Sequence, residues 1–298
     1  MRARDEDAAV GGAHPLLAEV QRRLDDDIDL AALAERFGYS PFHFHRVFTK
    51  GVGETPKAHI ARLRLEKALL LVVATNTTVL DIALTVGFKN HETFTRAFKR
   101  QFGATPRKIR DDARKIDRGA PDRRLGRSED SFTLSDVRFV TLPPMHLLAV
   151  RRIGPYTDQH APAYTDGDPY WPGLVAWAEA RGIGYSRLSY GFYLDMPGIT
   201  PDEAQRSDLC IEIDREVVGD ERYFYAPFAG GEFGVIEHRG PYPTLPQAYR
   251  VLVDAILTVP DRYVLNGAPP FEIHREVHRG GDPNANVTEV YFPVTRVR

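Results

Sequence analysis

The clearest hydrophobic pattern in the chain surrounds a glycine turn near residue 87. Apolar positions spaced for one face of a helix predict a short helix over Val79–Val86, and Gly87 interrupts that pattern. Asn90 is a residue type that often caps a new helix. In the helix that follows, Phe94 and Phe98 are one turn apart and share a buried face. Two helices around a tight turn are typical of a helix-turn-helix, although this layout alone occurs in many proteins.

The same pattern occurs earlier in the chain, at an offset of 49 residues before the turn and 50 after it. The matching positions are Ala34, Phe37, Gly38, Tyr39, Ser40, Phe44, Arg46, Phe48, Gly53, Thr55 and Pro56 with Ala83, Val86, Gly87, Phe88, Asn90, Phe94, Arg96, Phe98, Gly103, Thr105 and Pro106. Such a repeat indicates duplicated supersecondary units. Between them, Lys57–Ala74 reads as one connecting helix, roughly 27 Å long at 1.5 Å per residue. We also expect helices over Pro15–Leu24, Leu30–Phe37 and Ser40–Lys50.

The pattern changes in the back half of the chain, where short strands alternate with helices. The triplet Gly-Pro-Tyr follows a predicted strand twice, at Gly154–Tyr156 and 86 residues later at Gly240–Tyr242. The expected strands are His146–Ile153, Leu188–Asp195, Asp208–Asp214, Gly234–Arg239, Phe271–His278 and Val287–Val294, and the expected helices are Pro169–Arg181 and Leu245–Leu257. Two copies of β-α-β-β predict an α+β domain with approximate twofold symmetry and a groove where the copies meet.

Charge is divided unevenly between the two halves. From Leu30 to Arg110 there are 14 Lys and Arg against 5 Asp and Glu, whereas Asp130–Arg298 holds 15 against 23. A basic front half suits a polyanion such as DNA, although a charge excess is also common on ordinary solvated surfaces. The single cysteine, Cys210, excludes an internal disulfide framework and suits a reducing compartment. No apolar run approaches the roughly 20 residues of a membrane helix, and residues 1–13 lack the apolar region of a signal peptide.

The front half resembles the tandem helix-turn-helix domain of the AraC/XylS family of transcription regulators. The family signature GFxxxxxFxRxFKxxFGxTPxxxR spans Gly87–Arg110 without a gap. The resemblance implies base-reading side chains in both units: Phe42, His45 and Arg46 in the first, and His91, Glu92, Thr95 and Arg96 in the second. The choices at Phe42, His45 and Glu92 depart from the commoner family pattern, so the DNA sequence read cannot be inferred from relatives.

Arg46 and Arg96 are the strongest candidates for base contacts, because a guanidinium group can bind guanine O6 and N7 together. The alternatives for both are a phosphate contact or a surface salt bridge. Lys50, Lys99 and Arg100 are expected to contact phosphates, which adds affinity and salt dependence but little sequence choice. No metal or cofactor is expected.

Residues 136–296 resemble the GyrI-like (gyrase-inhibitor-like) effector-binding domain, through the two Gly-Pro-Tyr turns and the last strand. The resemblance implies that Glu289 lies in a pocket for cationic, aromatic molecules, with Tyr291 on the same strand face. The alternative is a structural salt bridge from Glu289 to an arginine such as Arg239 or Arg275. Tyr156, Tyr164, Tyr170, Trp171 and Tyr193 are candidate pocket walls, and each taken singly also suits the hydrophobic core.

Together these features predict a multidomain chain: an all-α tandem helix-turn-helix domain over 14–115, a linker over 116–131 and a GyrI-like α+β domain over 132–298. We expect a cytoplasmic, nucleoid-associated regulator that is not an enzyme. It would bind two adjacent major grooves of double-stranded DNA, respond to a small-molecule effector and alter contacts with DNA or RNA polymerase. One alternative is a hydrolase site in the back domain, using Glu289 with Tyr291 or Tyr156. Another is an architectural DNA binder whose back domain binds a protein.

Overall fold

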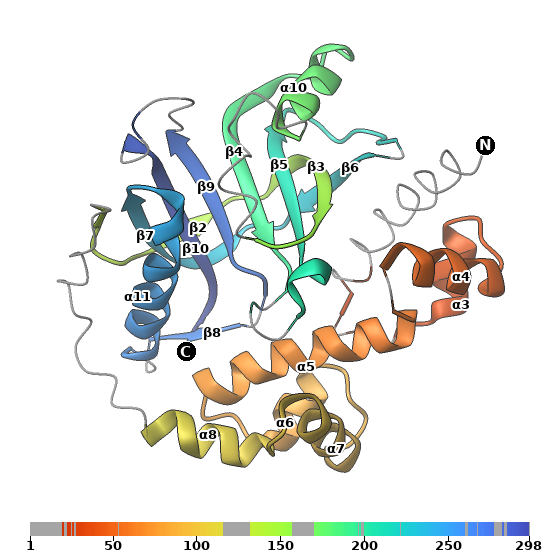
Figure 1. Cartoon of the computed structure of the whole chain (residues 1–298), viewed down its shortest axis with the longest axis vertical. Helices are drawn as coiled ribbons and strands as arrows, with labels where there is room; N and C mark the ends of the chain where they lie inside the picture. Colours follow the sequence, from red (N-terminus) through yellow and green to blue (C-terminus); the bar gives the residue numbers. More distant parts are fainter. Residues whose placement is uncertain are drawn as a thin grey trace. The chain divides into compact units, whose positions relative to one another are not determined.

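The chain divides into two compact units, residues 1–116 together with Gly219–Phe224, and the remaining residues. A computed structural model (Figure 1) describes residues 28–52, 54–115, 132–156, 170–195, 200–220, 222–259, 262–266, 268–276 and 285–297, with Val20, Arg23, Leu24, Asp26, Pro197 and Asp282. The predicted helix Pro15–Leu24 and the predicted linker 116–131 lie mostly or wholly outside these residues, as does Tyr164.

Between residues 28 and 115, the regular structure of the first unit is helical, as expected from its periodicity; its short segment Gly219–Phe224 contains instead the start of strand β6 (Tyr223–Phe228). The helices are α3 (Leu30–Arg36), α4 (Pro41–Val52), α5 (Pro56–Ala74), α6 (Val79–Thr85), α7 (His91–Phe102) and α8 (Pro106–Lys115). Capping side chains fix several starts: Asp29 accepts hydrogen bonds from the backbone N–H groups of Ala31 and Ala32, and Thr55 accepts one from Ala58. The bounds of α5 and α6 agree with the predicted bounds within one residue.

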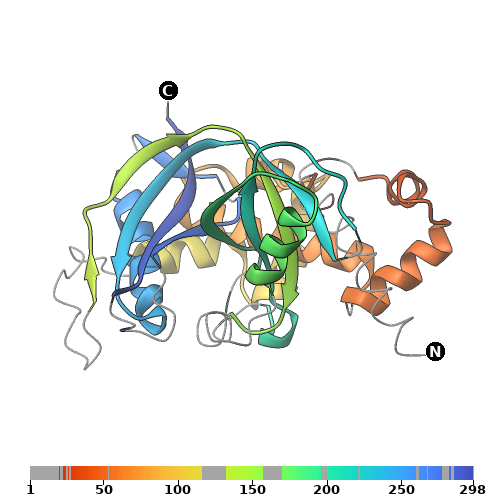
Figure 2. The same ribbon diagram turned by 90° about the horizontal axis from the view of Figure 1, so that it is seen from above.

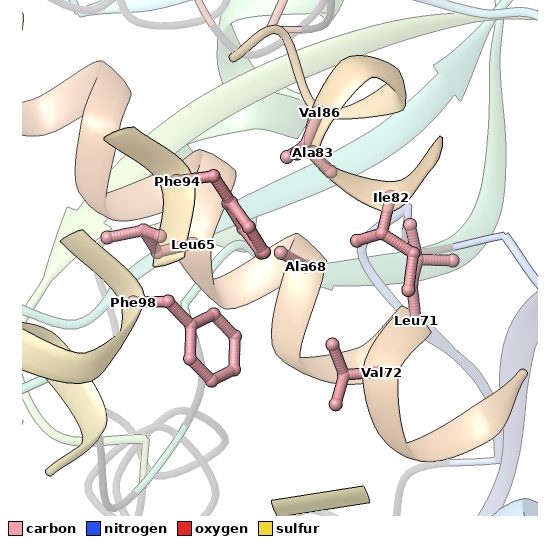
Figure 3. Packing of buried hydrophobic residues seen from close by; sticks show 9 residues of the cluster. All are labelled: Leu65, Ala68, Leu71, Val72, Ile82, Ala83, Val86, Phe94 and Phe98. Carbon is pink, nitrogen blue, oxygen red and sulfur yellow. The ribbon is translucent and has the colours of Figure 1, made fainter. Parts of the chain in front are cut away.

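Helix α5 contributes to two separate hydrophobic cores. Its first half packs with α3 and α4 around Phe44 and Phe48, and we call this part the first lobe. Its second half packs with α6, α7 and α8, which form the second lobe. Figure 3 shows the second core, where Phe94 and Phe98 of α7 lie against α5 and α6. Each lobe therefore carries one helix-turn-helix on a shared helix.

The described part of the second unit is an antiparallel sheet with two main helices, strongly curved in Figure 2. Its strands are β1 (Thr133–Leu134), β2 (Arg138–Leu142), β3 (Met145–Ile153), β4 (Tyr185–Tyr193), β5 (Arg206–Ile213), β6 (Tyr223–Phe228), β7 (Gly231–Arg239), β8 (Tyr263–Leu265), β9 (Phe271–Glu276) and β10 (Val287–Arg296). The helices are α10 (Trp171–Glu179) and α11 (Leu245–Leu257), with short 3-10 turns η1 (Asp202–Ala204) and η2 (Tyr242–Thr244).

The strand order places β4 beside β9 in the middle of the sheet. Along the sheet it runs β1-β7-β10-β9-β4-β5-β3-β6, with β2 beside β7 and β8 beside β10. Helix α10 packs on β3, β4 and β5, and α11 packs on β7, β8 and β10. Side chains from both helices reach Glu272 and His274, which point to the same side of β9 because strand residues alternate. Both helices therefore cover one face of the sheet.

Candidate DNA interface and ligand site

Helix α4 turns its polar and basic side chains outward. The Ser40 hydroxyl accepts a hydrogen bond from the His43 backbone N–H, and Pro41 occupies the first helical position, where a missing N–H costs nothing. Phe44 and Phe48 are buried in the first core, which fixes the rotation of the helix. Three of the predicted base-reading side chains, Phe42, His45 and Arg46, are consequently exposed.

Phe42 is unusual among these, because its large apolar side chain is 80% exposed. An exposed aromatic ring of this size is unfavourable in water unless a partner covers it. The Arg46 guanidinium lies 3.5 Å from Nδ1 of His43, and the His43 ring stacks on Tyr39 at 5.3 Å between centroids. Arg46 is therefore held at the helix surface beside Phe42. The side chain of Lys50 lies outside the described residues.

Helix α7 shows the same arrangement with a more basic outer face. Asn90 caps it by accepting a 2.9 Å hydrogen bond from the Thr93 N–H, and Gly103 ends it. Phe94 and Phe98 are fully buried. The predicted contact residues His91, Glu92, Arg96, Lys99 and Arg100 are all exposed.

Thr95 departs from the expected arrangement. We expected it on the open face of α7, but it is half-buried and its hydroxyl is shielded from solvent. Thr49 on α4 has the same environment. Neither hydroxyl has a hydrogen-bond partner among the described residues. Neither hydroxyl is therefore open to a partner in this arrangement of side chains.

In the second unit, Glu289 is held by arginines. Its carboxylate accepts hydrogen bonds from Arg138 on β2, from Arg275 Nε at 2.7 Å and from the Tyr291 hydroxyl at 2.8 Å. Burial opposes ionisation of Glu289, but the hydrogen bonds from Tyr291 and Arg275 and the charges of Arg275 and Arg138 outweigh it and lower its pKa. Arg239, the other predicted partner, pairs instead with Glu237.

A second buried carboxylate, Glu272 on β9, has no arginine partner among the described contacts. It is 1% exposed and accepts hydrogen bonds from the hydroxyls of Tyr193, at 2.7 Å, and Tyr249, at 2.8 Å. Nε2 of His274 lies 3.6 Å from the same carboxylate. Burial outweighs the two hydrogen bonds and raises the pKa of Glu272 to about 7. This carboxyl group is poised to gain or lose a proton near neutral pH.

Aromatic side chains from several elements converge on Glu272 and His274. Tyr156 packs edge-on against Tyr193 at 5.0 Å between centroids, and Trp171 packs edge-on against His274 at 5.6 Å. The Tyr156 hydroxyl is itself fixed, because it donates to a backbone carbonyl of β5 and accepts from the Asp195 N–H. Of the three predicted pocket residues, Tyr193 contacts the Glu272 carboxylate directly, Tyr156 packs on Tyr193, and Trp171 packs on His274.

Glu289 and Tyr291 lie on the opposite face of the sheet. In the β9–β10 ladder, Glu289 is opposite Ile273 and Tyr291 is opposite Phe271. Directly opposed residues share a face, so this pair belongs with Phe271 and Ile273 rather than with Glu272. Tyr291 accordingly stacks on Phe271 at 4.7 Å between centroids. The five predicted ligand-site residues therefore divide into two groups on two faces.

Glycine at position 191 leaves room beside Glu272. Gly191 is directly opposite Glu272 in the β4–β9 ladder, and a Cβ atom there would lie 3.2 Å from the Tyr193 hydroxyl oxygen. The absence of a side chain lets the Tyr193 hydroxyl approach the carboxylate. Sequence reasoning missed Glu272, because the segment Phe271–Glu276 reads FEIHRE and its several polar residues give no reason to single out one carboxylate.

Comparisons with known proteins agree with this division into two parts. Residues 135–295 match the family described as "GyrI-like small molecule binding domain", and residues 33–112 match a "Helix-turn-helix domain" family. The chain therefore belongs to the GyrI-like family, with an AraC/XylS-type helix-turn-helix domain in its first part. Within the described residues, no helix combines the length and apolar character needed to cross a membrane.

Three curated relatives carry names that refer to transcription or to binding at an origin. The chain is 38% identical over 136 residues to "Transcriptional regulator Rob" of Salmonella typhimurium, a match that covers 45% of this chain and 46% of the relative. It is 37% identical over 136 residues to "Right origin-binding protein" of Escherichia coli K12, with the same coverage. The chain thus spans about half the length of these relatives. "Probable transcription factor PqrA" of Proteus vulgaris is 36% identical over 93 residues, 31% of this chain and 76% of the relative.

Proposed function

We propose that this protein is a sequence-specific DNA-binding transcription regulator whose second unit binds a small-molecule effector. The observation that carries the proposal is the exposure of side chains on α4 and α7. Both helices bury two phenylalanines and leave Arg46 and Arg96 on the outer face, at matching positions of the repeat. An exposed arginine on a helix-turn-helix recognition helix has the geometry for guanine in a major groove. The names of the relatives support this reading.

The two lobes suit two adjacent major grooves on one side of a duplex. Helix α5 has 19 residues, which is about 28 Å at 1.5 Å per residue, and successive major grooves recur about every 34 Å. Phe42, His45, Arg46, His91, Glu92 and Arg96 would face the bases, whereas the Thr95 hydroxyl is shielded from solvent and would need a side-chain rearrangement to contact DNA. Lys99 and Arg100 would contact phosphates, and we assign Lys50 the same role from its place in the sequence. A protein with such a target acts in the cytoplasm, at the nucleoid.

For the effector, we propose the surroundings of Glu272 rather than of Glu289. Glu289 already has two arginine partners, whereas the partners of Glu272 are tyrosine hydroxyls. A carboxylate among aromatic rings is suited to a cationic aromatic molecule, since ring faces also attract cations. Because burial raises the pKa of Glu272 to about 7, a bound cation would favour the ionised form. Affinity for such a ligand should therefore increase as the pH rises through about 7.

The strand order supports a further part of the proposal, that the second unit consists of two β-α-β-β copies. One copy would be β3, α10, β4 and β5, and the other β7, α11, β9 and β10, meeting at the β4–β9 pair. The remaining strands would then be additions at the edges. We propose domain limits of 14–115 and 132–298, joined by 116–131, in keeping with the two matched families.

Binding to selected DNA tests the proposal. Duplexes would be enriched from a random-sequence library by the full-length protein, and affinity would be measured by electrophoretic mobility shift at rising salt. We expect sequence-selective binding that weakens with salt, and loss of selectivity in the double variant Arg46→Ala, Arg96→Ala. Enrichment of no sequence, or an unchanged double variant, would refute the DNA function. The variants Glu272→Gln and Glu289→Gln would then separate the two candidate effector sites by the binding of a fluorescent cationic dye.

A second candidate function is hydrolysis of a small molecule at Glu272. A carboxyl group with a pKa near 7, in contact with two tyrosine hydroxyls, has the properties of a general base. Turnover of a reactive ester by the full-length protein, abolished in Glu272→Gln and retained in Glu289→Gln, would favour this reading. Binding of the dye without any turnover would favour a purely regulatory site.

A further inference from the structure

The two lobes of the first unit meet at one residue of α5. Ile60 and Leu63 pack in the first core, and Leu65 and Ala68 pack in the second. Arg64 lies at the change from one core to the other. Because the two cores are separate clusters, the relative orientation of the lobes depends on α5 and on hydrogen bonds that connect one lobe to the other.

The Arg64 guanidinium makes such crossing bonds. Its Nε donates to the Leu24 carbonyl at 2.8 Å and one terminal nitrogen donates to the Asp26 carbonyl at 2.5 Å. The other terminal nitrogen donates to the Gly87 carbonyl at 2.8 Å. Leu24 belongs to the first core, whereas Gly87 is the turn of the second helix-turn-helix. One rigid, planar group thus holds backbone from both lobes, and arginine suits this because its donors have fixed directions.

The repeat itself indicates that this contact is special. Gly38 and Gly87 occupy the same turn in the two lobes and have φ of +73° and +81°. A Cβ atom on Gly87 would lie 2.6 Å from the Arg64 guanidinium carbon, whereas a Cβ atom on Gly38 would meet nothing within 4 Å. The left-handed φ favours glycine at both turns. Only at Gly87 does the missing side chain also make room for the arginine.

We propose that Arg64 is a positioning residue that fixes the mutual orientation of α4 and α7. In doing so it determines which spacing between two DNA half-sites the protein accepts. This inference rests on the proposed DNA function and adds to it. Arg64 itself contacts backbone carbonyls, so its effect on DNA would act through the placement of the two recognition helices.

The test uses the full-length protein and a duplex enriched from a random library by the wild-type protein. The two half-sites are located in that duplex by footprinting, and one base pair is inserted or removed between them. At about 10 base pairs per turn, this rotates one half-site relative to the other by about 36°. The wild type should lose at least ~10-fold in affinity, the size of losing one good base contact. Arg64→Met should bind the original duplex ~10-fold more weakly and lose less than ~3-fold on changing the spacing.

Two matched controls separate positioning from general damage. Arg110 donates to the carbonyls of Val72 and Thr77, and these two hydrogen bonds stay within the second lobe. Arg110→Met removes a similar arginine clamp and should keep the sharp spacing preference. Gly38→Ala and Gly87→Ala impose similar backbone strain, but only Gly87→Ala displaces Arg64 and should flatten the spacing profile.

A measurement without DNA keeps the inference separate from the proposed function. Spin labels on Ala32→Cys of α3 and Gln101→Cys of α7, both exposed positions, report the distance between the lobes in a Cys210→Ala background. We expect a narrow distance distribution in the otherwise wild-type protein and a broad one after Arg64→Met. An unchanged distribution with an unchanged spacing profile would overturn the role of Arg64. Failure of the wild-type protein to enrich any duplex would overturn the DNA function instead, whatever the spin labels show.

Discussion

Replacing Glu272 by glutamine should remove a pH dependence from the stability of the second unit. Burial raises the pKa of Glu272 from its ordinary 4.5 to about 7 in the folded protein. Between these two pH values the folded state keeps a proton that the unfolded state has lost. The contribution of Glu272 is therefore fully present below about pH 4.5 and is lost as the pH rises to about 7.

The expected magnitude follows from the size of the shift. At 1.36 kcal/mol per pKa unit, the free energy of unfolding should fall by about 3 kcal/mol between pH 4.5 and 7 because of this one group. The Glu272→Gln variant cannot ionise, so this fall should be absent from it. Its amide also changes the hydrogen bonds with Tyr193 and Tyr249, which shifts stability by an amount that does not vary with pH. The slope against pH is thus the informative quantity.

Urea unfolding followed by tryptophan fluorescence provides the assay. Both tryptophans of the chain, Trp171 and Trp177, are buried on α10, so the signal reports the second unit. Unfolding would be measured at unit steps from pH 4.5 to 8 for the wild type, Glu272→Gln and Glu289→Gln. Wild type and Glu272→Gln should diverge in slope across this range.

Glu289→Gln is the matched control, because the pKa shift of Glu289 has the opposite sign. Its pKa is lowered by Tyr291 and the two arginines despite burial. The stability it contributes is present above about pH 4.5 and is lost as the pH falls through its lowered pKa. Its removal should leave the slope between pH 5 and 8 unchanged. Equal slopes for wild type and Glu272→Gln in that range would show that Glu272 titrates normally and that the reasoning from burial is incorrect.

Three further predictions concern the first unit. Arg96→Ala should weaken binding to selected DNA by about 1–3 kcal/mol, measured by mobility shift, and relax the preference at one base pair. Lys99→Ala should instead weaken binding to all DNA sequences equally and reduce the slope of log affinity against log salt concentration by about 1. If the exposed Phe42 ring contacts a thymine methyl group, replacing that thymine by uracil in the first half-site should weaken DNA binding by the wild type but not by Phe42→Ala. A loss of affinity with uracil that persists in the variant would contradict this contact. Phe98→Ala should destabilise the first unit by about 3–5 kcal/mol in thermal unfolding, because it empties a fully buried site; a cost below ~1 kcal/mol would mean that the second core collapses around the gap.

Local signals in the sequence predicted the helices well. Helix α11 has the bounds expected from its periodicity, and α7 begins directly after its predicted cap, Asn90. These elements are specified by residues a few positions apart. The short strands β2 and β6 were not predicted, because Arg138–Leu142 and Tyr223–Phe228 become strands only by pairing with β7 and β3. A segment of five or six residues carries no information about which distant strand it will pair with.

The candidate ligand site shows the same limit. Glu272 and Glu289 both lie in predicted strands, and strand alternation alone could not tell which one meets an arginine. That difference is set by residues far away in the chain, Arg138 for Glu289 and Tyr193 for Glu272. Tyr291 was placed correctly on the face of Glu289, since two residues of one strand share a side. The sequence did not predict which face of the sheet the two helices cover, because that depends on the order of the strands in the sheet.

The pairing of β4 with β9 has a consequence for shorter versions of this chain. These strands join through the ladder from Ser189 to Phe192, opposite His274 to Phe271, and this seam lies between the two helix-bearing halves of the sheet. A fragment ending after β5 would expose the backbone donors and acceptors of β4 as a free edge. Such a fragment is expected to self-associate through that edge, so that two copies would rebuild the seam as a homodimer.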